Sequence, residues 1–153
     1  MFQSKWEFGL AAREALALRR AVLVEELGLP EAAAFDRYDE IAAHVYVWDS
    51  RGPIAAGRIF PQGEATGLGA IVSAKDRRQE PFMDLVLRIL LDKAQTLKGD
   101  PILAALRPGE AGLYLPFGFL KAEDRPDGLA IYSVPKDGVR WHSACQEGGG
   151  AGE

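Results

Sequence analysis

Apolar residues recur at helical spacing in two long stretches of the sequence. Residues 8–27 are rich in Ala, Leu, Arg and Glu, and they predict an amphipathic helix that ends at Gly28, just before Pro30. Residues 82–97 place their apolar side chains on one broad face, and Pro81 suits the first turn of a helix at that point. The pattern therefore predicts two main helices.

Five other stretches are short and rich in β-branched or aromatic residues, which is typical of strands. They are residues 44–48, 54–60, 65–73, 102–106 and 129–134. Gly67 and Gly69 lie inside the third of these, where glycines often mark a bulge or a close backbone approach. Short helices are expected at residues 31–35 and 109–115, with a polar loop at residues 36–40. This alternation predicts an α/β or α+β fold around a mixed sheet.

Composition and charge limit the functions that the chain can have. It carries 18 Lys and Arg against 22 Asp and Glu, and its basic residues never cluster beyond a pair. We therefore expect no nucleic-acid partner, because such proteins usually present a basic face. With Cys145 as the single cysteine and two histidines in all, we expect no intrachain disulfide and no bound metal. The apolar stretches are too short to span a membrane and no signal pattern is seen, so we expect a cytoplasmic protein with no membrane partner.

The length of 153 residues fits one hydrophobic core. Residues 1–140 are expected to form a single domain. The last stretch, residues 141–153, ends in a Gly-rich run of low complexity and is predicted to be disordered.

Four blocks of sequence carry more information in their order than any one of them carries alone. They are VEELGLP at 24–30 with FDRYDE at 35–40 and Ala43-His44, AGRIFP at 56–61, GAIV at 69–72, and LYLPFGF at 113–119. In this order and spacing, which covers roughly residues 8–120, they resemble the GNAT superfamily of N-acetyltransferases. The resemblance implies an α+β fold with a mixed, mostly antiparallel central sheet flanked by helices, in which two parallel strands splay apart.

The resemblance also implies an activity and the residues that perform it. GNAT enzymes bind acetyl-coenzyme A (acetyl-CoA) between the two splayed strands, here residues 65–73 and 102–106, and the acceptor amine attacks the thioester directly. Tyr114 stands where a Tyr protonates the departing thiolate. The backbone positions that would hold the pantetheine and the thioester are Ile71, Val72 and Ser73.

The segment that would bind the pyrophosphate departs from the GNAT pattern. That pattern is R/Q-x-x-G-x-G/A at the start of the main helix, where backbone N–H groups and the helix N-terminus hold the phosphates. Here it reads RRQEPF, so Glu80 adds a repulsive charge, Pro81 has no N–H to donate and Phe82 adds bulk. Charge-assisted hydrogen bonds from arginines would offset part of this loss. The candidate set for the pyrophosphate is Arg77, Arg78, Gln79 and Phe82.

The acceptor is expected to be a small-molecule amine or a protein amine. Asp36 and Asp39 could receive its cationic group at the rim of the sheet, and Arg58 is expected beside one of these acids. Residues 67–73 contain no Glu that could act as the general base, and His44 is a weaker candidate for that role. A homodimer is possible, with residues 129–134 pairing across the interface.

Three functions fit these features. The leading one is an acyl-CoA-dependent N-acyltransferase with Tyr114 as the general acid. The altered residues at 80–82 favour an alternative, a catalytically impaired GNAT-fold protein that binds or regulates a partner. A third reading is an acyl-homoserine-lactone synthase-like acyltransferase, whose E-x-D-x-Y-D and R-L-x-P patterns are echoed at 34–39 and 58–61, although Ala34 replaces the expected Glu.

Overall fold

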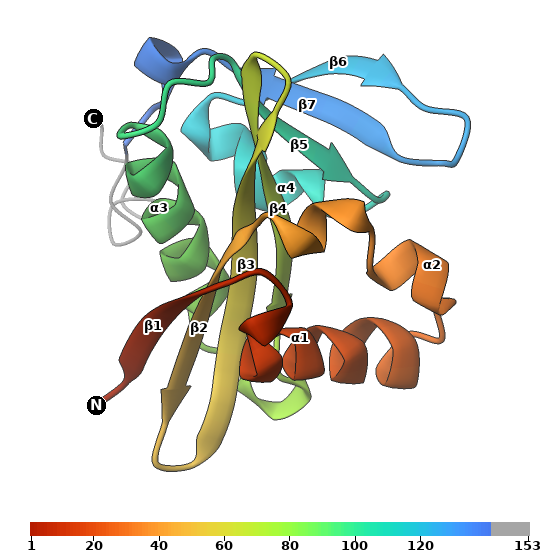
Figure 1. Cartoon of the computed structure of the whole chain (residues 1–153), viewed down its shortest axis with the longest axis vertical. Coiled ribbons are helices and arrows are strands. Elements are labelled where there is room, and N and C mark those ends of the chain that lie inside the picture. Colours follow the sequence, from red (N-terminus) through yellow and green to blue (C-terminus); the bar gives the residue numbers. More distant parts are fainter. Residues whose placement is uncertain (142–153) are drawn as a thin grey trace.

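The computed structural model describes residues 1–141, so Cys145 and nearly all of the predicted Gly-rich tail lie outside the described residues. Seven strands form one sheet in the order β1-β2-β3-β4-β5-β7-β6 (Figure 1). All neighbouring pairs are antiparallel except β4 and β5, which are parallel. The predicted fold class is confirmed. The strands are β1 (Gln3–Phe8), β2 (Ala43–Asp49), β3 (Gly52–Gln62), β4 (Ala65–Ser73), β5 (Ile102–Leu106), β6 (Leu120–Asp124) and β7 (Ala130–Val134).

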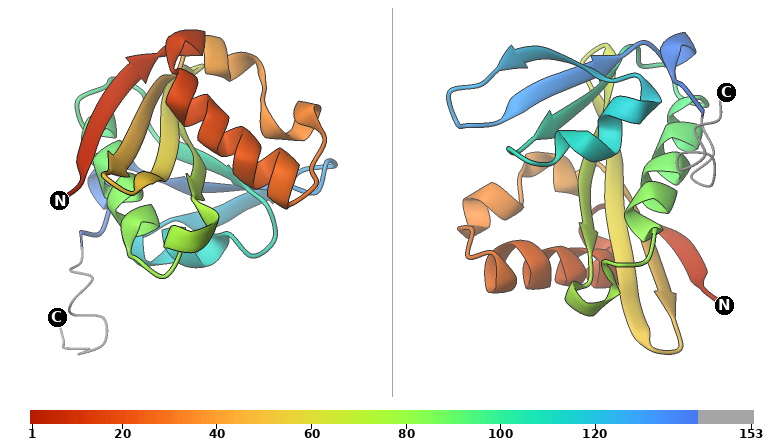
Figure 2. Two further views of the ribbon diagram at one scale, coloured as in Figure 1. Left: turned by 90° about the horizontal axis from the view of Figure 1, so that it is seen from below. Right: turned by 180° about the vertical axis from the view of Figure 1, so that it is seen from behind.

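Helices cover both faces of this sheet, with α1 and α2 on one face and α3 on the other (Figure 2). The described residues form four α-helices, α1 (Arg13–Arg19), α2 (Glu31–Ala34), α3 (Phe82–Ala94) and α4 (Ala111–Tyr114). Helix α1 continues as the π-helix η2 (Arg20–Glu26). Short 3-10 turns are η1 (Gly9–Ala11), η3 (Arg37–Glu40), η4 (Lys75–Arg77), η5 (Leu115–Phe117) and η6 (Lys136–Gly138). Within residues 1–141, no helix is long and apolar enough to cross a membrane.

Two hydrophobic clusters hold the layers together. On the face covered by α1, Tyr46, Ala56 and Val72 of the sheet pack against Leu18 and Val22. On the opposite face, α3 buries a continuous apolar stripe against the strands, formed by Val86, Leu87, Leu90, Leu91 and Ala94. This stripe is the helical pattern read from residues 82–97, although the helix itself ends at Ala94.

The N-terminal region differs from the prediction of one helix over residues 8–27. Residues up to Phe8 form β1, and the helix begins only at Arg13. Gly9 makes the turn between the two elements: its φ is +64°, and a Cβ there would lie 2.9 Å from the carbonyl oxygen of Glu40. The predicted helix was too long at its start, because the composition of residues 8–27 does not reveal this turn.

The bulge expected near Gly67 and Gly69 occurs in β4. In the pairing with β3, Ala56 faces Val72 and Arg58 faces Gly69, so β4 holds one more residue than β3 over this stretch. Gly69 has φ +139° and Ala70 has φ +49°. The glycine accommodates a backbone conformation that other residues rarely adopt.

Beside this bulge, β4 and β5 separate. Their described pairing is confined to Thr66 with Ile102 and Gly67 with Leu103, although both strands run further. The parallel pair therefore opens at its carboxyl end, where the backbone of the β4 bulge faces the gap. This geometry positions the site described below.

The last strand, β7, lies between β5 and β6, and both its edges are paired. The expectation that residues 129–134 could pair across a homodimer interface is therefore wrong for this strand. The unpaired edges of the described sheet belong to β1 and β6.

Candidate functional site

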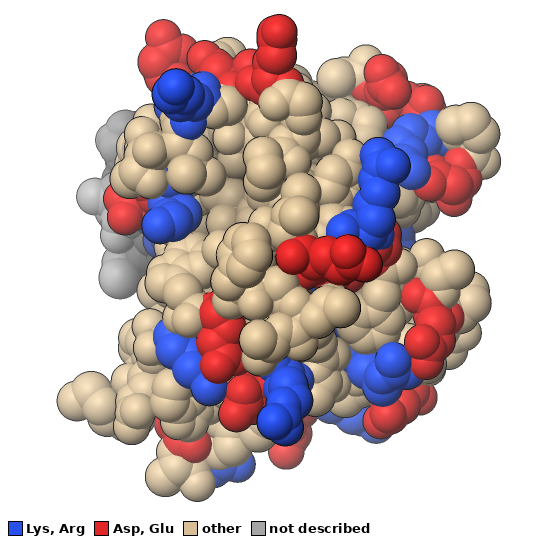
Figure 3. Space-filling model, in the orientation of Figure 1, with Lys and Arg blue, Asp and Glu red and all other residues tan. Residues whose placement is uncertain are grey.

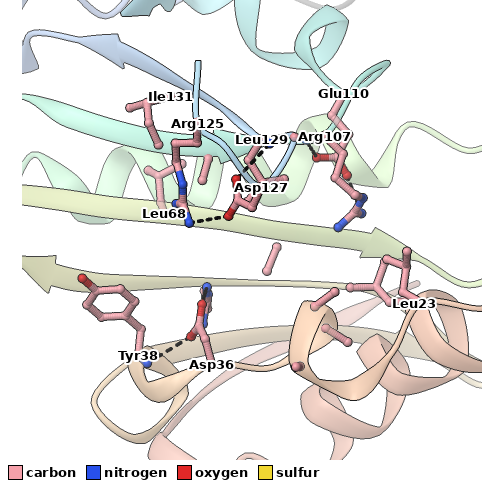
Figure 4. Close-up of a pocket in the computed structure, with 18 of the residues that line it drawn as sticks. Leu23, Asp36, Tyr38, Leu68, Arg107, Glu110, Arg125, Asp127, Leu129 and Ile131 are labelled. Atoms are coloured by element: carbon pink, nitrogen blue, oxygen red, sulfur yellow. Dashed lines mark hydrogen bonds and ion pairs between the residues drawn. The ribbon is translucent and has the colours of Figure 1, made fainter. Parts of the chain in front are cut away.

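A pocket of about 700 Å³ opens where β4 and β5 part, and we call it the splay pocket. It reaches from the two strands to the α1–α2 segment on one side and to the β6–β7 hairpin on the other (Figure 4). Its residues include Leu23, Leu29, Ala33, Asp36, Tyr38, Arg58, Phe60, Leu68, Ala70, Val72, Leu103, Ala105, Arg107, Glu110, Arg125, Asp127, Leu129 and Ile131. Figure 3 shows acidic and basic side chains mixed across this face of the molecule rather than separated by sign.

Tyr114 lies at the C-terminal end of α4 and is almost fully buried. Its ring packs edge-on against Phe119 at 5.4 Å between centroids. A Cβ placed on Gly69 would lie 3.5 Å from the Tyr114 hydroxyl, so this hydroxyl approaches the bulge of β4. Burial raises the pKa of Tyr114 above its usual value, and the negative charge of Glu110 raises it further. The phenol is therefore a protonated hydrogen-bond donor at physiological pH.

The three residues expected to hold the pantetheine and thioester follow the bulge. The side chain of Ile71 packs in the core under α3, whereas Val72 lines the splay pocket. The hydroxyl of Ser73 donates to the carbonyl oxygen of Ile54 at 3.3 Å. The backbone of this segment borders the opening between β4 and β5.

Arg77 makes two sets of ion pairs inside the chain. Its guanidinium donates to both carboxylate oxygens of Asp49, at 3.0 and 2.6 Å, and to those of Glu80 at 3.1 Å. The Arg77 side chain is only 4% exposed. These hydrogen bonds lower the pKa of Asp49 to about 2 and raise that of Arg77. Arg77 thus ties the segment before α3 to the turn between β2 and β3.

Arg78 points to a different part of the molecule. It forms a bidentate pair with Glu26 at 2.6 and 2.5 Å and donates to the carbonyl oxygen of Ser73. The hydrogen bonds from Arg78 lower the pKa of Glu26. The side chain of Arg78 remains partly exposed, and Gln79 next to it is exposed.

Glu80 and Phe82, which the resemblance places at the glycine positions of the GNAT pattern, contact other parts of the chain. Glu80 faces Arg77 and Arg51, and the ring of Phe82 meets that of Phe2 edge-on at 5.2 Å. Neither residue lines the splay pocket. The altered segment therefore leaves the described pocket open.

Asp36 and Asp39 do not face the pocket together. Asp36 lines it and accepts a bidentate pair from Arg58 at 2.6 and 2.8 Å. Asp39 is 2% exposed and lies between Arg19 at 2.6 Å and Arg58 at 2.9 Å. Burial by itself would raise the pKa of Asp39, but the two guanidiniums outweigh it and the pKa is lowered. The two acids also form a capping box at η3, so part of the polar loop predicted at residues 36–40 is a short 3-10 helix.

His44 lies behind this pair of acids. It is fully buried, with Nδ1 3.5 Å from a nitrogen of Arg19 and Nε2 3.2 Å from the carbonyl oxygen of Asp39. Burial lowers the pKa of His44. Its contacts are those of a buried structural histidine, and it does not line the splay pocket.

Several charged residues of the site were not identified from the sequence. The pocket also holds an Arg107–Glu110 pair and an Arg125–Asp127 pair, each at 2.6 Å. The Arg107–Glu110 spacing of three residues was a local signal for a pair at the start of α4. Asp49 had no local signal, because its partner Arg77 lies 28 residues further along the chain.

Comparison with known proteins assigns this architecture. Residues 18–91 match the family described as the acetyltransferase (GNAT) domain. An acyl-CoA N-acyltransferase from Pseudomonas aeruginosa superimposes with a TM-score of 0.75 at 18% identity, covering 87% of this chain and 99% of that one. Escherichia coli ElaA gives 0.72 at 21% identity, covering 87% and 98%.

A GNAT-family acetyltransferase from Staphylococcus aureus Mu50 gives a TM-score of 0.68 at 10% identity, covering 89% of this chain and 99% of that one. At such identities the superpositions show the fold alone. The chain has the GNAT fold, and its residues 18–91 match the model of the acetyltransferase (GNAT) domain.

Proposed function

We propose, from the match of residues 18–91 to the GNAT acetyltransferase domain and from the GNAT fold of the chain, that this chain is an acyl-CoA-dependent N-acyltransferase. The donor is acetyl-CoA and the acceptor is an amine. The observation that carries the proposal is that the β4 bulge, where Ala70 lines the splay pocket, lies at the opening between β4 and β5 and close to the hydroxyl of Tyr114, a buried residue outside the pocket lining.

The residues divide the work as follows. The backbone of Ile71, Val72 and Ser73 binds the pantetheine and thioester beside the bulge. The amine nitrogen attacks the thioester carbonyl carbon, so a C–N bond forms and the C–S bond breaks. Tyr114 donates its proton to the departing sulfur, the amine releases a proton to water, and water returns a proton to Tyr114 before the next turnover. Because the pKa of Tyr114 is raised, its hydroxyl stays protonated until negative charge develops on the departing sulfur.

The pyrophosphate end relies on side chains rather than on glycines. Arg78 and Gln79, which reach the surface, contact the pyrophosphate by charge-assisted and neutral hydrogen bonds. Arg77 holds residues 77–82 in position through its ion pair with Asp49, and Phe82 is the first residue of α3, next to the proposed pyrophosphate position. Arg78 exchanges its bond to Glu26 for the phosphate oxygens.

Isothermal titration of the protein with acetyl-CoA tests the proposal, followed by an assay of free CoA thiol in the presence of amines. We expect saturable binding, and we expect Arg78→Ala to weaken it about tenfold, the scale of one charge-assisted hydrogen bond. Arg13→Ala, on the exposed side of α1, is the matched control and should bind as the wild type does. No heat at millimolar acetyl-CoA would refute the proposal.

A second candidate is a non-catalytic GNAT-fold protein that binds or regulates a partner. It is favoured by one observation, that the guanidiniums of Arg77 and Arg78 are already paired with Asp49, Glu80 and Glu26. Restoring glycine at positions 80 and 82 distinguishes the two candidates. If only the restored variant binds acetyl-CoA, the second candidate is correct, and if both bind equally, it is wrong.

A further inference from the structure

Two walls of the splay pocket carry apolar side chains. Leu23, Leu29 and Ala33 line the pocket from the segment that runs from η2 to α2, and Leu129 and Ile131 line it from the end of the β6–β7 hairpin and from β7. Leu23, Leu129 and Ile131 can be followed in Figure 4. Ordered apolar side chains on two facing walls favour a ligand that fills the space between them with carbon.

An aromatic stack forms another part of the pocket wall, at the end opposite Leu23 (Figure 4). The rings of Tyr38 and Phe60 are stacked at 4.3 Å between centroids, and the guanidinium of Arg58 lies 4.8 Å from the Phe60 centroid. All three residues line the pocket. They present flat, rigid surface to a ligand, with the charged end of Arg58 turned to Asp36 and Asp39.

The charges of the pocket are matched one to one. Each of its three acids is bonded to one of its three arginines, as Asp36 with Arg58, Glu110 with Arg107 and Asp127 with Arg125. Its lining contains no lysine. The pocket therefore offers no surplus of negative charge to a ligand with several positive charges.

A polycation could bind only by taking acids away from these arginines. Withdrawing Asp36 would leave Arg58, whose side chain is 12% exposed and whose Nε already lacks a partner, with Asp39 alone. Separating a largely buried pair is unfavourable, because the remaining charge stays desolvated. A single amine on an apolar body requires no such exchange.

The same surroundings favour the reactive form of a single amine. Desolvation beside the apolar walls, in a pocket whose charged side chains are already paired with one another, lowers the pKa of an alkylammonium group, which increases the fraction of free amine. Only the free amine can attack a thioester. A general base with an unpaired carboxylate is then not required, which agrees with the pairing of all three acids.

We propose that the acceptor is a monoamine with an apolar body, of the arylalkylamine or hydrophobic alkylamine class, and not a polyamine. This inference rests on the proposed function for its catalytic part, while the binding part concerns the pocket alone. The amine nitrogen lies toward the β4 bulge and Tyr114, and the body lies between Leu23 and Leu129.

The test compares 2-phenylethylamine and n-hexylamine with spermidine as acceptors for the full-length protein and acetyl-CoA. We expect kcat/KM to be at least about tenfold higher for the two monoamines. Leu129→Glu, which adds a carboxylate to the apolar wall, should lower this preference about tenfold or reverse it. Leu120→Glu, at a 71% exposed position of β6 outside the pocket, is the matched control and should keep the wild-type preference.

Calorimetric titration with 2-phenylethylamine in the absence of acetyl-CoA separates this inference from the proposed function. Binding that is lost in Leu129→Glu and kept in Leu120→Glu, in a protein that does not bind acetyl-CoA, would support the pocket assignment and refute the acyltransferase. Acetyl-CoA binding with a preference for spermidine, or with no binding or transfer to either monoamine, would overturn the inference. So would equal preferences in the two leucine variants.

Discussion

The Tyr114 hydroxyl is held in place by burial, by the ring of Phe119 and by the bulge of β4. Replacing Tyr114 with Phe removes this hydroxyl and keeps the packed ring. We expect kcat to fall by about 10²-fold or more, the usual scale for one general acid, with acetyl-CoA affinity changed less than about twofold. Steady-state kinetics and calorimetry measure the two effects separately.

Tyr132→Phe is the control for this substitution, because Tyr132 is a half-buried tyrosine of β7 outside the pocket lining. It should leave kcat unchanged. If Tyr114→Phe kept most of the wild-type kcat, Tyr114 would be a core residue and not the acid.

Asp49 provides a pH-dependent contribution to stability. Its pKa in the folded chain is about 2, below its ordinary value of 3.8, because Arg77 stabilises the carboxylate. This contribution is therefore present above about pH 4 and is lost as the pH falls toward 2. We expect Asp49→Asn to be less stable than the wild type at pH 7, with a difference that shrinks between pH 4 and pH 2. Urea unfolding at several pH values measures it.

Asp76→Asn, one residue before Arg77 and exposed, is the matched control for the Asp49 experiment. Its stability should follow that of the wild type at each pH. A difference between Asp49→Asn and the wild type that stays constant from pH 7 to pH 2 would show that the pair with Arg77 does not contribute as inferred.

At the scale of elements, the contact between β3 and α3 depends on Gly57. A Cβ at Gly57 would lie 2.8 Å from a methyl of Val86 and 3.0 Å from one of Leu90. We expect Gly57→Ala to reduce the free energy of unfolding by about 1–3 kcal/mol, because the packed core has no room for another methyl group. Chemical denaturation measures this change.

Gly112 in α4 is the matched control, since nothing lies within 4 Å of a Cβ placed there. Gly112→Ala should be neutral or stabilise the chain by up to about 1 kcal/mol, because alanine favours the helix. A Gly57→Ala variant as stable as Gly112→Ala would show that α3 can move away from the sheet at little cost.

Elements with a long, regular pattern could be predicted from the sequence. The apolar stripe of α3 and the β-branched strands can be predicted because buried apolar residues recur every 3.6 residues along a helix or every 2 residues along a strand. The sequence does not predict strand β1, although Trp6 and Phe8 alternate with Lys5 and Glu7. The residues after Phe8 have the composition of a helix, and this composition extends the predicted helix back to Phe8. The turn at Gly9 depends on Glu40, which is distant in sequence.

The features of the site also differ in how far the sequence predicts them, and the difference again depends on whether the signal is local. The bulge at Gly69 and the position of Tyr114 could be read from local residue patterns and from the resemblance to GNAT proteins. The pairing of Arg77 with Asp49 and of Arg78 with Glu26 could not, because it joins residues 28 and 52 positions apart. Whether those arginines bind a pyrophosphate remains a prediction of the titration proposed above.

At the scale of the whole molecule, a buried network joins the first helix to the sheet. Arg19 from α1 and Arg58 from β3 both donate to Asp39, which precedes β2, and Arg58 extends the network to Asp36 at the pocket. His44 of β2 packs beside Arg19. The network holds Asp36, at the pocket wall, in a fixed position relative to Arg58 of β3, so loss of the network should disturb the pocket as well as the fold.

The substitution Asp39→Asn tests this network, because it keeps the shape of the side chain and removes the charge. Two buried guanidiniums would then share no buried carboxylate, and we expect a loss of about 3–5 kcal/mol in the free energy of unfolding. Asp36→Asn, at a side chain 45% exposed, should cost less, about 1–3 kcal/mol, because Arg58 keeps its bond to Asp39. Urea denaturation of both variants at pH 7 gives the comparison. Equal costs would mean that Arg19 and Arg58 find other partners when Asp39 is neutral, and that α1 is held to the sheet mainly by the apolar contacts of Leu18 and Val22.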